Sequence, residues 1–276
     1  MTASLDLNAL DAFVVELNAA AASVILPLFR AENGLEDKGG PGAFDPVTAA
    51  DRGAEAAIRA MIGRRHPDHG VIGEEYGEDR PDADFVWVLD PIDGTRAFIA
   101  GLPVWTTLIG LRHEGRPMLG SIGQPYLDEV FIGHAGGSRL VSRGSSRPLV
   151  TRKGTPLARA IIATTDPEAT FTPAEIDAWR RVRAAVRLAR LGCDAYAYAM
   201  VAVGALDLVV EAGLKSWDIE AAIPVLAGAG GQVTDWNGAP MGRFGGQAAL
   251  VGDPALLEEV LPLLAAAANR RHNGPS

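Results

Sequence analysis

The sequence predicts an α/β protein built in two halves. Apolar residues recur at helical spacing in the first 62 residues, strand-like runs separated by turn residues follow, and strands and helices alternate after about residue 150. The chain of 276 residues exceeds the usual size of a single hydrophobic core. We therefore expect an N-terminal α+β half at residues 1–150 and a C-terminal α/β half at residues 151–276.

The N-terminal half is expected to begin with two amphipathic helices. Apolar spacing predicts a long helix over residues 10–28 and a second over residues 50–62. The glycine-rich segment 34–44 between them predicts a loop. Strands are expected at residues 85–89, 104–111, 118–122 and 129–132. These four strands suit one meandering sheet.

The C-terminal half is expected to alternate strands with helices after a polar stretch at residues 142–147. The expected strands are 160–165, 186–191, 206–210 and one near Val233. The expected helices are 173–185, 194–203, 218–229 and 254–268. The tail at residues 269–276 is expected to fray.

Composition limits the classes of partner. A net charge of −9 argues against a nucleic-acid-binding surface, which is normally basic. The single cysteine, Cys193, excludes an internal disulfide and suits a reducing compartment. The first residues show no basic region followed by an apolar stretch, and no uninterrupted apolar run approaches membrane-spanning length. We expect a cytoplasmic protein with neither nucleic-acid nor membrane partners.

The run from Asp90 to Thr95 is the most informative motif. It follows the apolar segment 85–89, so two carboxylates stand at the end of a buried strand, where they need a partner or a cation. Pro91 and Gly94 favour a tight turn that lets both carboxylates and the Ile92 carbonyl converge on one point. Such oxygen ligands are typical of Mg²⁺. Taken alone, however, this spacing is also that of a surface turn or a helix cap.

Further acidic residues support the metal site. Glu74 follows the short apolar pair Val71-Ile72, and Asp218 precedes an alanine-rich helical pattern. Together, Gly73-Glu74-Glu75, Asp90-Pro-Ile-Asp-Gly-Thr95 and Trp217-Asp218-Ile-Glu-Ala-Ala222 resemble the signatures of the inositol monophosphatase family. Asp45-Pro-Val-Thr-Ala-Ala-Asp51 adds a fourth block and Glu211 a fifth position. The resemblance covers nearly the whole chain.

This resemblance implies an αβαβα sandwich and hydrolysis of a phosphate monoester with two or three Mg²⁺ ions. It also implies a homodimer and inhibition by Li⁺. The implied metal ligands are Glu74, Asp90, the Ile92 carbonyl, Asp93 and Asp218. The implied catalytic groups are Glu74 and the pair Thr95 and Asp51, which would orient the attacking water. The groups expected to contact the substrate are Lys38, Asp93, Gly94, Thr95, Asp194, Glu211 and Asp218.

Several of these residues also have a purely structural interpretation. Thr95 and Asp194 can cap the helices that begin beside them. Asp51 can be a first-turn acid of its helix, and Lys38 a solvated surface lysine. The sequence alone leaves both interpretations open.

The substrate is the finer question. Residues 93–109 and 192–196 resemble the histidinol-phosphate phosphatases of the family more than the inositol monophosphatases. Acidic contacts from Asp194 and Glu211 would suit a ligand that carries an ammonium and an imidazole. An inositol-1-monophosphatase or a nucleotide 3′-phosphatase is the alternative, because it would share every metal ligand. A catalytically inactive regulatory member should lack at least one ligand, and none is missing.

Overall fold

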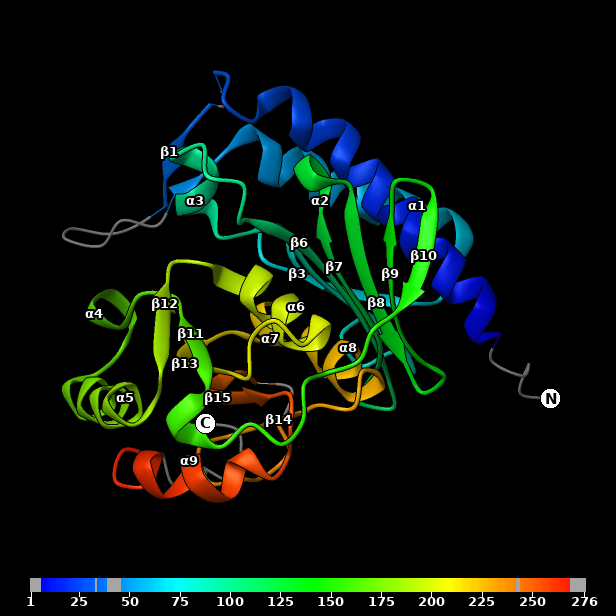
Figure 1. Ribbon diagram of the computed structural model, residues 1–276. Coiled ribbons are helices and arrows are strands. Elements are labelled where there is room, and N and C mark those ends of the chain that lie inside the picture. Colours follow the sequence, from blue (N-terminus) through cyan, green and yellow to red (C-terminus); the bar gives the residue numbers. More distant parts are fainter. Residues whose placement is uncertain (1–5, 33, 39–45, 242–243, 269–276) are drawn as a thin grey trace.

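Five layers of helices and sheets make up the fold, here described from a computed structural model. The structure describes residues 6–32, 34–38, 46–241 and 244–268. Helices α1 (Leu7–Ile25) and α2 (Ala49–Arg65) cover an eight-stranded sheet. Helices α6 (Asp194–Val203) and α8 (Ala222–Gly228) separate it from a five-stranded sheet, whose outer face α5 (Pro173–Ala185) and α9 (Leu256–Leu264) cover (Figure 1). This order confirms the expected αβαβα sandwich.

The first sheet is largely the expected meander. Its strand order is β10-β9-β8-β7-β6-β5-β3-β4, and neighbours are antiparallel except β3 and β5, which run parallel. The strands are β3 (Gly70–Gly73), β4 (Gly77–Asp79), β5 (Phe85–Asp93), β6 (Thr106–His113), β7 (Arg116–Gln124), β8 (Glu129–His134), β9 (Gly137–Ser142) and β10 (Ser145–Pro148). The polar stretch 142–147 was not expected to be strand, yet most of it forms the hairpin of β9 and β10. Backbone pairing there needs no buried side chains, so no apolar pattern marks it.

The second sheet has the order β12-β11-β13-β15-β14. Its strands are β11 (Ile161–Thr164), β12 (Leu188–Leu191), β13 (Leu208–Leu214), β14 (Gln232–Thr234) and β15 (Gly246–Val251). Strand β11 runs parallel to β12 and β13, whereas β15 is antiparallel to both of its neighbours. Strand β15 was not expected. The first sheet ends at Pro148 and the second begins at Ile161, and the division of the chain near residue 150 stays a prediction.

The expected helix over residues 218–229 is wrong as a single helix. It consists of α7 (Ser216–Ile219) and α8, which begins at Ala222. Pro224 explains the break, because it has no N–H for the Glu220 carbonyl and its ring would clash with that group in a continuous helix. The other short elements are β1 (Glu36–Asp37), β2 (Pro46–Val47), α3 (Thr95–Ile99), α4 (Pro167–Thr170) and three 3₁₀ turns at Leu26–Leu28, Pro125–Leu127 and Leu157–Arg159.

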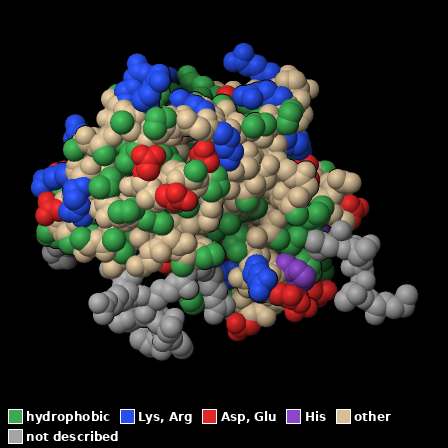
Figure 2. All heavy atoms as spheres, turned by 60° about the horizontal axis from the view of Figure 1, so that its bottom comes forward, with side chains coloured by type: hydrophobic (Ala, Val, Ile, Leu, Met, Phe, Trp, Pro, Cys, Tyr) green, Lys and Arg blue, Asp and Glu red, His purple; other side chains and the backbone are tan. Residues whose placement is uncertain are grey.

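Helix α1 is apolar because one of its faces lies in the core. The segment Leu7–Leu28 is long and apolar enough to cross a membrane by length and composition, which the sequence reading had not expected. Its buried residues, however, pack with α2 and the first sheet: Leu10, Phe13, Val14, Leu17, Ala21 and Ile25. Such burial is typical of a core helix. On the opposite side of the molecule, acidic and basic side chains are interspersed with hydrophobic ones, as on a solvent-exposed surface (Figure 2).

Two sequence predictions fall partly or wholly outside the described residues. Of the glycine-rich loop 34–44, the structure describes 34–38, which includes Lys38. The tail at 269–276 lies outside the described residues altogether.

Candidate metal centre

The end of β5 brings two carboxylates together through an irregularity in the strand. Residues three apart in a regular strand point to opposite faces of the sheet. The pairing of β5 with β6 shifts register between Asp90 and Asp93, as at a β-bulge. The Thr107 hydroxyl donates to the Pro91 carbonyl inside this irregular segment at 2.8 Å. Asp90 and Asp93 can therefore face the same site.

A third carboxylate comes from α7. Ligand atoms of Asp90, Asp93 and Asp218 all lie within 4.8 Å of one another. The Lys215 N–H donates to Asp218 Oδ2 at 2.7 Å, which fixes the side chain at the start of α7. Just beyond α7, the buried Glu220 pairs with the buried guanidinium of Arg112 on β6, with Nε to Oε2 at 3.0 Å. The pair attaches α7 to the first sheet.

Glu74 approaches from β3. Because β3 runs parallel to β5, the two strands end at the same edge of the sheet, and the Glu74 N–H donates to the Leu89 carbonyl at 3.2 Å. Lys38 Nζ lies 3.7 Å from Glu74 Oε1 and 2.9 Å from Glu75 Oε1. Glu74 lines one cavity of about 210 Å³ with Asp90, Ile92, Asp93 and Asp218. The structure thus brings together all five expected metal ligands.

The electrostatics of this cavity suit a cation. Burial raises the pKa of Glu74 to about 7 and that of Asp218 to about 6. Burial and the neighbouring carboxylates also raise the pKa of Asp90 and Asp93 well above the usual range. Asp90 Oδ1 is buried without a hydrogen-bond partner among the described residues. A hard cation would supply that partner and neutralise the repulsion.

Thr95 and Asp51 both lie close to the site, but in the structure no hydrogen bond joins these two side chains to each other. The Thr95 hydroxyl donates to the Ile92 carbonyl at 3.1 Å. Asp51 accepts the N–H and the hydroxyl of Thr48, at 2.8 and 2.5 Å, in the capping box of α2. Its charge still raises the pKa of Glu74 and Asp90, so it lies within electrostatic reach of the centre. Thr95 is the first residue of α3, and Gly94 is its N-cap.

Helix α6 points its N-terminus at Asp93. The Ala195 N–H donates to Asp93 Oδ2 at 2.7 Å, and the charge of this carboxylate is favourable there. The N-cap itself is Cys193, which makes no side-chain capping bond. Asp194 is therefore not the helix cap that the sequence left open as an alternative. It is the first helical residue, with a φ of +43°.

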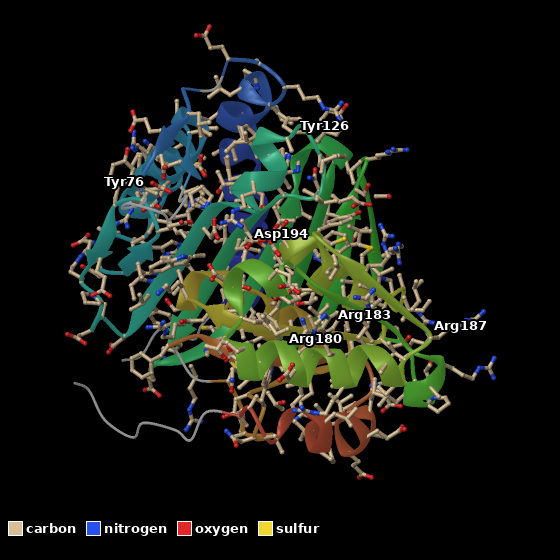
Figure 3. All side chains as sticks on the ribbon, turned by 90° about the vertical axis from the view of Figure 1, so that its left-hand side faces the viewer. Tyr76, Tyr126, Arg180, Arg183, Arg187 and Asp194 are labelled. Atoms are coloured by element: carbon tan, nitrogen blue, oxygen red, sulfur yellow. The ribbon has the colours of Figure 1, made fainter. Side chains whose placement is uncertain are left out.

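Gly94 makes room for Asp194 beside the metal cavity. A Cβ on Gly94 would lie 2.9 Å from Asp194 Cγ, and Gly94 itself has a φ of +82°. Burial raises the pKa of Asp194 to about 6, while the charge of Arg96 opposes this shift. Figure 3 shows Asp194 in the middle of the molecule, where the elements of the two halves meet.

A second cavity of about 570 Å³ adjoins the first, and the two share Gly94, Thr95, Thr165, Thr170 and Asp194. Leu102 and Leu191 give it apolar walls. Arg96 and Asp166 add an ion pair in which Nη1 and Oδ2 are 3.6 Å apart. The cavity combines apolar surface with an excess of negative charge, so it suits a partly apolar, cationic group.

Glu211 lines the metal cavity from β13. Its carboxyl is fully buried and accepts the N–H and the hydroxyl of Thr165, at 2.8 and 2.9 Å. Burial nevertheless raises its pKa to about 8, and the charge of Asp194 acts in the same direction. Glu211 is therefore mostly protonated at neutral pH in the absence of a cationic ligand.

Sequence reasoning missed other residues of the site. Tyr198 lies four residues after Asp194 on α6 and lines the metal cavity, and this helical spacing was a usable signal. Thr165 and Asp166 come from the segment between β11 and α4, and Arg96 comes from the short helix α3, and their sequences show no pattern that could have marked them. Glu55 was a further usable signal, since it is an acid on the apolar face of α2.

The comparisons with known proteins agree with this geometry. The profile of the Inositol monophosphatase family matches residues 6–272. "Bifunctional phosphatase IMPL2, chloroplastic" from Arabidopsis thaliana is 44% identical over 234 residues, which are 83% of this chain and 66% of the plant protein. "Histidinol-phosphatase" from Mycobacterium tuberculosis is 33% identical over 221 residues, which are 79% of this chain and 84% of that protein.

Solved structures give the same result. An inositol monophosphatase from Zymomonas mobilis superposes with a TM-score of 0.79 at 38% identity, covering 91% of this chain and 95% of that one. The Thermotoga maritima IMPase superposes with a TM-score of 0.81 at 26% identity, covering 94% and 97%. Because sequence, fold and the acidic cluster agree over nearly the whole length, this chain belongs to the inositol monophosphatase family.

Proposed function

We propose that this metal-dependent phosphomonoesterase hydrolyses L-histidinol phosphate to L-histidinol and phosphate, a step of histidine biosynthesis. The observation that carries the proposal is the acidic, partly apolar cavity that opens beside the metal centre and contains Asp194. Histidinol carries an ammonium and an imidazole, so it would match both properties of this cavity. The relatives named histidinol-phosphatase support the same substrate.

The metal ligands in this proposal are Glu74, Asp90, the Ile92 carbonyl, Asp93 and Asp218. Mg²⁺ bound there would neutralise phosphate charge, lower the pKa of a water molecule and stabilise the departing alkoxide. The protein contributes a cluster of carboxylates that the bulge in β5, the end of β3 and helix α7 hold in place before metal binds. In the reaction, a water oxygen forms a new bond to phosphorus, the bond from phosphorus to the alcohol oxygen breaks, and a proton passes to that oxygen.

Thr95 and Asp51 are proposed to orient the attacking water. Thr95 supports this role because it lines both the metal cavity and the adjoining cavity. Its hydroxyl can accept a hydrogen bond while donating to the Ile92 carbonyl. Lys38, which lies between Glu74 and Glu75, is proposed to add positive charge at the side where phosphate enters.

Asp194 is proposed to recognise the cationic group of the substrate. With a pKa of about 6, it is mostly ionised at neutral pH. Arg96 offsets the charge of Asp166, which leaves Asp194 as the net negative charge of the adjoining cavity. Glu211 would add a second acidic contact at the boundary of the two cavities, because a bound ammonium favours its ionised form.

The proposal is tested by the initial rates of purified protein with Mg²⁺ on four phosphate monoesters: histidinol phosphate, inositol 1-phosphate, a nucleoside 3′-phosphate and glycerol phosphate. The highest kcat/KM is expected for histidinol phosphate. Chelator should abolish turnover, and millimolar Li⁺ at subsaturating Mg²⁺ should reduce it. A preference for inositol phosphate or the nucleotide would overturn the substrate and leave the metal chemistry in place. A homodimer and a cytoplasmic location belong to the same proposal.

A further inference from the structure

A buried carboxylate on α2 holds the turn that follows Glu74. Glu55 is fully buried and lies one helical turn after Asp51, on the same face of α2. Glu55 Oε2 accepts the Glu75 N–H at 2.8 Å, and Oε1 accepts the Tyr76 N–H at 3.2 Å. Tyr76 is labelled beside the blue and cyan elements of the N-terminal half in Figure 3. Both bonds are to main-chain groups directly after Glu74.

The surroundings of Glu55 hold its side chain in place. Arg59 Nε donates to Glu55 Oε1 at 2.7 Å, which offsets the cost of burying the carboxylate. The same guanidinium donates to the Gly77 carbonyl at 2.5 Å. Gly73 leaves the necessary space, because a Cβ there would lie 2.1 Å from Glu55 Oε1. Glu55 and Arg59 thus bind the three consecutive residues after Glu74.

The opposite side of the turn faces the active site. The side chain of Glu75 accepts a hydrogen bond from Lys38 Nζ at 2.9 Å, and Glu74 lines the metal cavity. Because the backbone at residues 75–77 is fixed to α2 and the Glu74 N–H is bonded to Leu89, the backbone of Glu74 is held beside the cavity. Without Glu55, two backbone N–H groups would lose a charged acceptor, and the turn could relax.

We propose that Glu55 is a positioning residue, which sets the turn after β3 so that Glu74 faces Asp90, Asp93 and Asp218 before the metal binds. The inference rests on the proposed role of Glu74 as a metal ligand. Partners that orient metal ligands from outside typically contribute about ten- to a hundredfold in metal affinity. Glu55 would act through Glu74, with no contact to metal or substrate.

The test is Glu55→Gln, which keeps the shape of the side chain but places an amide NH₂ toward one of the two backbone N–H groups. Titration calorimetry with Mg²⁺ on the metal-free protein should show a Kd raised by about tenfold. The kcat at saturating Mg²⁺ should change much less than the Mg²⁺ concentration needed for half-maximal rate. This split between affinity and turnover is what a positioning role predicts.

The matched control is Glu175→Gln. Glu175 is also a buried glutamate, and it accepts the N–H and the hydroxyl of Thr172 at 2.8 and 2.9 Å, but it lies on α5 in the outer layer. Both variants should lower the Tm, and only Glu55→Gln should raise the Kd for Mg²⁺. Equal Kd values for Glu55→Gln and wild type would overturn this inference and leave the proposed metal centre in place.

If Glu55→Gln does not fold, a second variant provides the test. Glu55→Asp keeps the charge for Arg59 and withdraws the carboxylate from the turn by one methylene. It should also weaken Mg²⁺ binding, and an unchanged Kd would overturn the inference. A wild-type protein that binds no Mg²⁺ would overturn the metal centre itself, and the inference with it.

Discussion

At the scale of single residues, the site gathers more negative charge than its own hydrogen bonds compensate. Asp93 and Asp218 each accept one backbone N–H, whereas Asp90 Oδ1 has no partner among the described residues. In the absence of metal, burial holds the pKa of each of these carboxyls above its usual value, and repulsion from neighbouring carboxylates adds to this for Asp90 and Asp93. A substitution that removes one charge should therefore help folding and harm metal binding.

Asp93→Asn is expected to keep the fold and lose activity. The asparagine oxygen can still accept the Ala195 N–H, so the start of α6 stays attached while repulsion in the cluster falls. The Tm of the metal-free variant should equal or exceed that of wild type. Its kcat with Mg²⁺ should fall by several orders of magnitude, because a proposed ligand has lost its charge. The exposed Asp79→Asn on β4 serves as the control, and near wild-type turnover by Asp93→Asn would contradict the assignment.

Asp194→Asn is expected to change substrate preference. Asparagine tolerates the positive φ of this position, so the backbone should be preserved. A charge-assisted hydrogen bond to an ammonium contributes about 1.5–3 kcal/mol, so kcat/KM for histidinol phosphate should fall by about ten- to a hundredfold. Glycerol phosphate has no cationic group and should be nearly unaffected. Equal losses on both substrates would show that Asp194 supports the structure and does not recognise the substrate.

At the scale of elements, the site depends on where strands and helices stop. The bulge at the end of β5, the end of β3 and the start of α6 all meet at one edge of the first sheet. Helix α7 adds Asp218, and the chain turns at residues 220–221 before α8 begins. The sequence predicted that the acids at the metal centre are ligands and that a strand precedes Asp90. Clear apolar patterns mark that strand and the segment before Glu74. The sequence could not predict the break after α7, because the alanine-rich pattern runs through it and only Pro224 marks the interruption.

The pair Arg112 and Glu220 is expected to hold α7 in place. Both side chains are buried, so Glu220→Gln would leave the guanidinium without its counter-charge and should lower the free energy of unfolding by about 3–5 kcal/mol. Urea denaturation measures this loss. Replacing both residues with apolar ones, Arg112→Met and Glu220→Leu together, should recover most of the stability. A single variant within about 1 kcal/mol of wild type would contradict the role of the pair.

At the scale of the whole molecule, the active site lies where two sheets share one helical layer. The core around α6 and α8 contains Leu108 and Phe131 from the first sheet and Val209 and Leu250 from the second. Local periodicity predicted most of the helices and the central strands. It missed β10, which forms a local hairpin with β9 and has no buried apolar pattern, and β15, which pairs with the distant strand β13 through contacts that a short window of sequence does not contain. The cavity that adjoins the metal centre was only partly predicted for the same reason, because Asp166 and Thr165 reach it through tertiary folding.

The stability of the metal-free protein should fall as the pH rises from about 6.5 to 8. The pKa of Glu74 is about 7 and that of Glu211 about 8, against 4.5 for an ordinary glutamate, so the folded state binds more protons than the unfolded state in this range. The stability that these protons support is complete below pH 4.5 and is lost as the pH passes through the folded-state values. Two partly buried histidines act in the opposite direction, since burial lowers the pKa of His66 and sets that of His69 at about 4, but their effect is largely complete by about pH 6.5.

Thermal unfolding in chelator between pH 6.5 and 8 measures this decline, and Glu211→Gln should make it shallower. Mg²⁺ binds the ionised carboxylates, so the rise in Tm that it causes should grow over the same pH range. The cation and the protons are thus alternative ways of neutralising one buried cluster. A Tm in chelator that stays constant or increases from pH 6.5 to 8 would show that the cluster is already ionised without metal, and would contradict this account of the site.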